Sequence, residues 1–376
     1  MTKYTRWYKE LILPAALLSS LIIGAGMFAL PYLFNAAGIL TGVFYLIAST
    51  FIFSIIHLRY GEVIEKTSGK HRFAGYARIY LGRRGFWLGA IVAGVGLTLV
   101  LTAYLALGPV FLRLLVPALG DSLNLYLFWG VGAMAILLSL NRLKNFESLA
   151  VVAMLAIILV LFGFGLGERE SATGLPLFNP AFLFLPYGAV LFALYGRPAI
   201  SSLKDYFEEN NPPAGGNSGN LRKAVILGTV IPAVFYLLFA SGVIWLSPQG
   251  VSPDALTGLL AIPSWLLVLV GILGMLAIWT SYFLLGLEVK NILRYDFKLP
   301  SFLATTTVVA APLVLYLLGL RNFIGLVTVV GGVFLALESI MVILMHHKLR
   351  GRTHKGELIL IAVFILGGLY EIWKTL

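Results

Sequence analysis

The sequence contains no cysteine, and charged residues make up only 11% of its 376 residues. The missing cysteines exclude disulfide frameworks, thiolate zinc sites, covalent haem attachment and cysteine nucleophiles. The scarcity of charge excludes intrinsic disorder, which depends on charged and polar composition. An ordinary soluble domain is about half apolar and about a quarter charged. This chain is 60% hydrophobic, so a soluble protein is also excluded.

Long apolar runs recur along the whole chain. A helix needs about 20 residues to cross a hydrocarbon layer of about 30 Å. The runs are continuous and do not alternate between apolar and polar residues, which favours helices over barrel strands. We therefore predict an all-α integral membrane protein whose spans occupy residues 11–37, 39–61, 86–112, 124–140, 146–166, 184–204, 223–246, 264–290, 301–318, 323–345 and 357–373, eleven in total.

The 27 lysines and arginines set the orientation, because cytoplasmic loops carry an excess of basic residues. With the N-terminus in the cytoplasm, only Arg113, Arg169, Arg321 and Lys374 fall outside. We therefore expect a plasma-membrane protein with a cytoplasmic N-terminus and an external C-terminus. The net charge of +11 is then a consequence of membrane orientation. Nucleic acid is not expected as a partner.

Two spans are interrupted near their middle. The first contains Gly24-Ala25-Gly26-Met27-Phe28-Ala29-Leu30-Pro31, and the sixth contains Phe192-Ala193-Leu194-Tyr195-Gly196-Arg197-Pro198. Unsatisfied backbone groups cost several kcal/mol in lipid, so such breaks persist only where protein buries them or where they line a cavity. Small residues that merely allow close helix packing, with a proline kink, are the alternative explanation.

Breaks at matching places in two five-span halves are typical of inverted-repeat transporters that bind substrate at the midplane. We predict one transmembrane transporter domain over residues 1–376, with repeat one at 11–166, repeat two at 184–345 and an extra helix at 357–373.

The stretch from Gly24 to Tyr32, followed by Asn35 to Gly38, resembles the first-helix signature of the amino acid/auxin permease family. That family belongs to the amino acid-polyamine-organocation superfamily. The sixth-span break is similar to the family's aromatic-Gly-small-Pro segment. The resemblance implies the LeuT-type fold with discontinuous helices 1 and 6. It also implies secondary import of a neutral amino acid, aromatic or large and apolar, as in bacterial aromatic amino acid permeases and sodium-coupled neutral amino acid transporters.

A zwitterionic substrate needs amide donors for its carboxylate and carbonyl acceptors for its ammonium. The start of the outer half-helix offers free amides, and the end of the inner half-helix offers free carbonyls. Glycine allows the substrate to approach the backbone closely. We predict that the substrate contacts the backbone of Ile22, Ile23, Gly24, Ala25, Gly26 and Met27 in the first span and of Phe192 and Leu194 in the sixth.

Polar and aromatic side chains are expected to wall the pocket. The candidates are Thr98, Thr102 and Tyr104 in the third span, Phe192 and Tyr195 in the sixth, and Trp279 in the eighth. Trp279 stands out because the other six tryptophans lie near predicted membrane interfaces. The alternative for both Trp279 and Tyr104 is packing in the protein core.

A coupling cation needs hard oxygen ligands, and no acid is centrally placed to supply them. Thr280 and Ser281 lie near the middle of the eighth span. The resemblance implies a Na⁺ site that joins them to carbonyls of Ser20 and Ile23. Alternatively, the two hydroxyls bond their own helix.

Some proton-coupled relatives place a lysine in the fifth helix, and the span from Ser148 to Gly165 has none. Na⁺ is therefore the expected co-transported ion, with proton-coupled symport as the alternative. No further cofactor is expected.

Buried charge within a span indicates function, because it is costly. Glu338 lies in the inner third of the tenth span, and we expect it to pair with Arg197 or Arg59 in a cytoplasmic gate or to take part in proton coupling. A purely structural pair, or a side chain that reaches the interface, is the alternative.

Other classes fit less well. A channel or passive facilitator needs a continuous polar pathway, and no rings of repeated polar residues occur. An enzyme is not expected, because intramembrane catalysis needs a clustered set of acids, histidines or a serine with its base. We place all five histidines, His57, His71, His346, His347 and His354, at cytoplasmic helix ends. A nucleotide-binding loop is absent, which argues against ATP-driven pumping.

Overall fold

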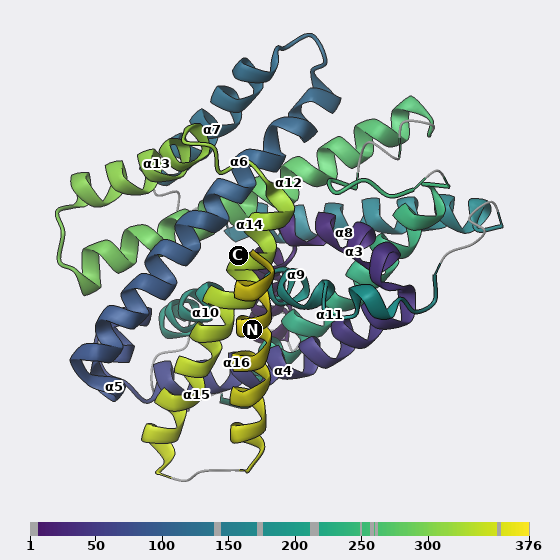
Figure 1. Ribbon diagram of the computed structural model, residues 1–376. Coiled ribbons are helices and arrows are strands. Elements are labelled where there is room, and N and C mark those ends of the chain that lie inside the picture. Colours follow the sequence, from purple (N-terminus) through teal and green to yellow (C-terminus); the bar gives the residue numbers. More distant parts are fainter. Residues whose placement is uncertain are drawn as a thin grey trace.

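The computed structural model describes residues 7–138, 144–170, 176–210, 218–248, 250–255, 259, 262–351 and 355–375. Within these residues the regular structure is entirely helical. Figure 1 shows the helices gathered into one bundle, with α9 near the centre of the view.

The first half of the chain begins with an interrupted helix and continues with four further spans. The first span comprises η1 (Tyr8–Ile12), α2 (Leu13–Ile22), η2 (Ala25–Ala29) and α3 (Leu30–Ala37). It is followed by α4 (Ile39–Glu65), α5 (Phe73–Ala90), η3 (Ile91–Val95), α6 (Gly96–Leu115), α7 (Asp121–Leu138) and α8 (Lys144–Glu168).

The second half repeats this order. A short η5 (Pro180–Phe182) precedes the interrupted sixth span, which consists of α9 (Pro186–Ala193) and α10 (Arg197–Asn210). The later elements are α11 (Ser218–Trp245), α12 (Ser264–Asn291) with η7 (Ile292–Asp296), α13 (Ser301–Leu317), α14 (Phe323–Val329), η8 (Val330–Leu335), α15 (Ala336–Arg350) and α16 (Lys355–Thr375).

The described helices account for the predicted spans. Eight are long and apolar enough to cross a membrane, and the two halves of the first span form a further one, bent by 51°. The shorter apolar helix α13 and the broken pair α9 and α10 supply the remaining two. The predicted class, an all-α membrane protein with discontinuous first and sixth helices, is confirmed.

The first span breaks because Ile23 and Gly24 leave helical geometry. Gly24 is extended, with φ −127° and ψ −158°, before the chain turns into η2. A Cβ on Gly24 would lie 2.7 Å from the Tyr104 hydroxyl and 2.8 Å from the Ser281 hydroxyl oxygen. Glycine at this position therefore leaves room for side chains of α6 and α12 to approach the break this closely.

The sixth span breaks after Ala193, and helix resumes at Arg197. Proline at 198 falls in the first turn of α10, where its missing amide costs no helical hydrogen bond. The two breaks touch each other, because a Cβ on Gly26 would lie 2.6 Å from the Ala193 Cα. The predicted pairing of the interruptions therefore brings two sets of free backbone groups together.

The neighbouring spans hold these breaks in place. Helix α11 packs against α2, α4 and α8, while α12 packs against α6 and α8. The last two helices, α15 and α16, run side by side in Figure 1 and contact each other. Helix α16, the eleventh span, also contacts η8 and α9, so it packs against the second half of the bundle.

Candidate functional site

A small closed cavity lies where the two breaks meet. Its volume is about 10 Å³, which is room for about one water molecule. Its walls come from the first span, α6, the sixth span and α12, through Leu21, Ile22, Gly26, Val100, Tyr104, Phe192, Tyr195 and Leu285. Three aromatic rings among apolar side chains make this a site for an apolar or aromatic group.

Amide donors border the cavity. Ala25 and Gly26 open η2, and the first amides of a helix have no partner within it. The Tyr104 hydroxyl lies at hydrogen-bond distance from the Ala25 backbone and from Ser281. The Tyr104 and Phe192 rings meet edge to face, with centroids 6.5 Å apart. Donors suited to a carboxylate therefore stand beside an aromatic wall.

The carbonyls at the helix ends are held by a residue that the sequence reasoning missed. Tyr236 of α11 is fully buried, and its hydroxyl lies within hydrogen-bond distance of the Ile22 carbonyl and 2.9 Å from the Ala193 carbonyl. A buried tyrosine hydroxyl needs a partner. That requirement was the only sequence signal at this position.

Several predicted wall residues lie elsewhere. Thr98 and Thr102 each donate a hydrogen bond to their own helix, to the carbonyls of Gly94 and Thr98. Trp279 stacks on Phe128, with centroids 6.1 Å apart and planes 10° apart, and it is not part of the cavity wall. Leu194 is buried but also lies off the wall. Ile23 and Met27 are fully buried at the break.

The predicted cation ligands are brought together only in part. The Ser281 hydroxyl oxygen lies 3.4 Å from the Ser20 carbonyl and 3.2 Å from the Leu21 carbonyl. The Thr280 hydroxyl donates to Leu276 of its own helix at 2.7 Å. Around Ser281, α12 and the end of α2 therefore present hydroxyl and carbonyl oxygens, the ligand chemistry that suits a hard cation. The described residues contain no cluster of three or more His, Asp or Glu side chains that could hold a metal.

Next to the cavity, at the start of α10, lies a buried ion cluster around Arg197. Its Nε lies 2.6 Å from Glu338 and its Nη1 lies 2.9 Å from Glu288. The Tyr195 hydroxyl accepts from Nη2 at 2.9 Å and donates to Glu338 at 3.1 Å. Arg197 is 1% exposed and lies over the Phe73 ring, 4.7 Å from its centroid. We call Tyr195, Arg197, Glu288 and Glu338 the buried ion cluster.

Of the two predicted partners for Glu338, Arg197 is the one in contact. Arg59 instead pairs with Glu357 of α16 at 3.2 Å. Glu288 is only 5% exposed and belongs to the buried ion cluster. The gating role of Arg59, Arg197 and Glu338 stays a prediction.

The expectation that every histidine lies at a cytoplasmic helix end is wrong for His57. This side chain is fully buried against the sixth-span break, where the Gly196 amide donates to its Nε2 at 3.2 Å. The ring proton must then sit on Nδ1, which faces the Thr229 hydroxyl at 3.1 Å. The Thr229 hydroxyl donates its own hydrogen bond to the Val225 carbonyl. The sequence could not reveal this contact, because the Gly196 amide is 139 residues away from His57 in the chain.

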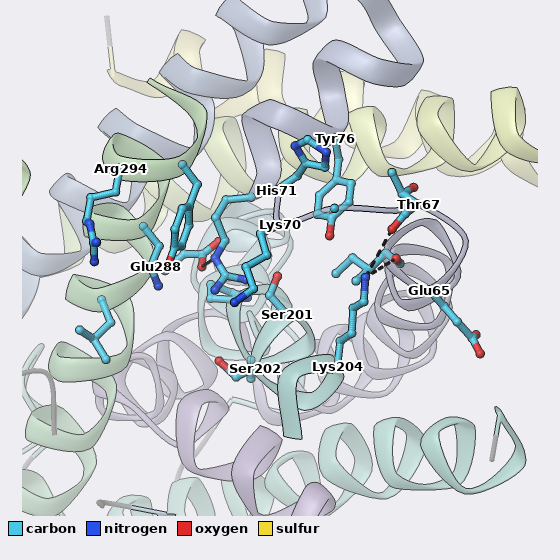
Figure 2. Close-up of a pocket in the computed structure, with 18 of the residues that line it drawn as sticks. Glu65, Thr67, Lys70, His71, Tyr76, Ser201, Ser202, Lys204, Glu288 and Arg294 are labelled. Carbon is cyan, nitrogen blue, oxygen red and sulfur yellow. Dashed lines mark hydrogen bonds and ion pairs between the residues drawn. The ribbon is translucent and has the colours of Figure 1, made fainter. Parts of the chain in front are cut away.

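A large cavity of about 1170 Å³ opens on the side predicted to face the cytoplasm (Figure 2). It lies between the end of α4 with its following loop, α10 and α12 with η7, and Figure 2 shows Lys70, Lys204, Glu288 and Arg294 around it. Glu288 lines this vestibule and Tyr195 lines the central cavity. The buried ion cluster therefore stands between the two cavities.

Paired breaks around a closed central cavity, a vestibule on one side and a bundle of membrane spans define a secondary transporter rather than an enzyme. Residues 8–373 match the model of the tryptophan/tyrosine permease family. The chain belongs to this family and is a secondary transporter of amino acids. A search of curated protein sequences finds no match.

Solved transporter structures share the fold. MhsT in complex with L-phenylalanine is 13% identical with a TM-score of 0.74, over 95% of this chain and 98% of that one. An Eremococcus coleocola manganese transporter is 13% identical with a TM-score of 0.68, over 99% of this chain and 87% of that one. Mhp1, a nucleobase-cation-symport-1 family transporter with bromovinylhydantoin bound, is 15% identical with a TM-score of 0.67, over 88% and 76%. At such identities the likeness establishes the fold, which is LeuT-type.

Proposed function

We propose that the protein imports an aromatic amino acid by alternating access, driven by a Na⁺ gradient. The observation behind this proposal is the contact between the two breaks beside Tyr104, Phe192 and Tyr195, which puts backbone donors and acceptors next to an aromatic wall. The name of the tryptophan/tyrosine permease family supports an aromatic substrate. The narrower kinship with the amino acid/auxin permease family rests on the resemblance in the first and sixth spans.

In the proposed binding mode, the substrate carboxylate accepts from the amides of Ala25 and Gly26, with the Tyr104 hydroxyl beside them. The ammonium donates to carbonyls at the ends of α2 and α9. The aromatic side chain packs against Phe192. The cavity must enlarge to admit it, because an amino acid does not fit in about 10 Å³.

Alternating access then requires two gates. The vestibule reaches Glu288, so the buried ion cluster is the barrier that opens to release substrate on that side. The predicted orientation makes this side the cytoplasm of a plasma-membrane protein with its N-terminus inside. The predicted repeats at 11–166 and 184–345 would move against each other around the central cavity, with the helix at 357–373 as an addition.

For Na⁺, we propose ligands from Thr280 and Ser281 on α12 together with the carbonyls of Ser20 and Ile23. The approach of the Ser281 hydroxyl to the end of α2 supports this assignment. Thr280 would have to turn from the Leu276 carbonyl toward the ion. Na⁺ is thus proposed as a co-transported ion.

Proton coupling is a second candidate, favoured by His57. Its Nε2 accepts from Gly196 at the sixth-span break, so a proton on that nitrogen would remove the acceptor and free the break. This makes His57 the group through which a proton would act on the sixth-span break.

Uptake of labelled L-tryptophan and L-tyrosine into proteoliposomes tests the proposal, with Na⁺ and pH gradients imposed separately. We expect accumulation that requires Na⁺, and at least a tenfold weaker response to Na⁺ in Ser281→Ala and Thr280→Ala. The matched control is Thr307→Ala, because Thr307 is exposed and bonds only its own helix, at Leu303.

The outcomes separate the candidates. Na⁺ dependence that survives in both variants would reject the ion ligands. Accumulation driven by the pH gradient alone, and lost in a His57 variant, would establish the second candidate. Equilibration without accumulation under either gradient would identify a passive facilitator.

A further inference from the structure

Tyr236 occupies the acceptors that the proposed binding mode gives to the substrate ammonium. Its hydroxyl lies against the carbonyl of Ile22, the last residue of α2, and against that of Ala193, the last residue of α9. These carbonyls end the two half-helices that meet at the central cavity. One side chain from α11 therefore bridges both breaks.

The Ile22 carbonyl is already fully used. A carbonyl oxygen has two lone pairs, and here it accepts from the Gly24 amide at 2.7 Å and from Tyr236. An ammonium cannot donate to this oxygen unless one of the two leaves. The Gly24 amide is fixed by the backbone, so the Tyr236 hydroxyl is the group that can be displaced.

A phenol and an ammonium can both donate a hydrogen bond to the same carbonyl oxygen, the phenol through its O–H and the ammonium through its N–H groups. The phenol has one proton for two carbonyls, whereas the ammonium has three. The ammonium therefore outcompetes the hydroxyl when substrate is present. In the closed arrangement, whose cavity of about 10 Å³ is too small for an amino acid, the hydroxyl shares its one proton between the two carbonyls.

We propose that the Tyr236 hydroxyl stands in for the substrate ammonium when the carrier returns without substrate. Unpaired carbonyls in a membrane interior are costly. With the hydroxyl in place, the two breaks can pass through the closed arrangement without substrate while one donor is shared between the two carbonyls. This inference rests on the proposed function, and it makes Tyr236 a positioning residue for the return step.

The return step can be measured separately from the loaded step. Net uptake needs the unloaded carrier to return, whereas exchange of labelled for unlabelled substrate uses loaded carriers in both directions. In Tyr236→Phe the ring remains and only the hydroxyl is lost. We expect net L-tyrosine uptake to fall at least fivefold while exchange stays within twofold of wild type.

Binding gives a second readout. Without the competing hydroxyl, Tyr236→Phe should bind L-tyrosine about fivefold more tightly, the factor that one buried hydrogen bond contributes. Its desamino analogue, 3-(4-hydroxyphenyl)propanoate, has no ammonium and should gain nothing. A residue that only packs in the core would not separate the two ligands in this way.

The matched control is Tyr282→Phe. Tyr282 is also fully buried, and its hydroxyl has no hydrogen-bond partner among the described residues, so its loss should leave net uptake and exchange unchanged. Unfolding curves of both variants check their folding.

Equal loss of net uptake and exchange in folded Tyr236→Phe would overturn the inference, as would equal net uptake by this variant and wild type. Failure of the proposed function is distinguishable, because wild type itself would then show neither uptake nor exchange of aromatic amino acids.

Discussion

Removing the positive charge from the buried ion cluster tests how the barrier below the cavity is built. In Arg197→Gln the carboxylates of Glu338 and Glu288 lose the guanidinium that lies 2.6 Å and 2.9 Å away. Glu288 keeps a more distant cation, Arg72, whose Nε lies 3.7 Å from it. Glu338, which is 3% exposed, keeps only the Tyr195 hydroxyl among the described contacts.

The expected loss in the free energy of unfolding follows from the partners that each carboxylate keeps. Breaking a buried pair by removing one partner costs about 3–5 kcal/mol, mostly because the other charge stays buried. Glu338→Gln should cost less, about 1–3 kcal/mol, because Arg197 still pairs with Glu288 and the new amide oxygen still accepts. In the double variant two neutral amides face each other, and no buried carboxylate is left alone. It should therefore be more stable than Arg197→Gln by about 1 kcal/mol or more.

The assay is denaturant or thermal unfolding of the four proteins in one detergent, followed by tryptophan fluorescence. The matched control is Lys66→Gln, which removes an exposed pair with Glu62 and should change the free energy of unfolding by less than about 1 kcal/mol. A double variant whose loss equals the sum of the two single losses would refute the reasoning, because the charges would then act independently.

Two further predictions concern the breaks themselves. Gly26→Ala should abolish substrate binding and cost about 1–3 kcal/mol, because its Cβ would lie 2.6 Å from the Ala193 Cα. Gly163→Ala, with nothing within 4 Å, is its control in ligand-binding and unfolding measurements. His57→Phe should reduce uptake at least tenfold by leaving the Gly196 amide without its acceptor, whereas His57→Gln, which can still accept, should retain more. Equal uptake by the two His57 variants would show that the acceptor does not matter.

The fold could be predicted from the sequence because its determinants are local. Apolar length defines each span, and the Gly24 and Gly26 pair or the Gly196 and Pro198 pair defines each break. The contact between the two breaks followed as well, since paired interruptions in two halves must meet for their backbone groups to be satisfied. Tyr104, Phe192 and Tyr195, which were among the predicted wall residues, line the cavity where the breaks meet.

The partners of the breaks could not be predicted in this way. Tyr236 is 43 residues from Ala193 and 214 from Ile22, and His57 is 139 residues from Gly196. Nothing in the local pattern of α4 or α11 says which face of the helix meets a free backbone group. Thr98 and Thr102 were predicted as wall residues, and in the structure each hydroxyl donates to a carbonyl of its own helix, as hydroxyls in membrane spans commonly do.

These long-range partners connect stability to transport. Free amides and carbonyls at membrane depth are tolerated only while something pairs with them. Here each group has a different partner: Tyr236 for the carbonyls, His57 for the Gly196 amide, and Arg197 for the carboxylates below. Opening either side of the carrier must exchange some of these partners for substrate or water. A variant that weakens a partner should therefore change the rate of the step in which that partner is exchanged, and the binding of substrate only where the two compete for the same atoms.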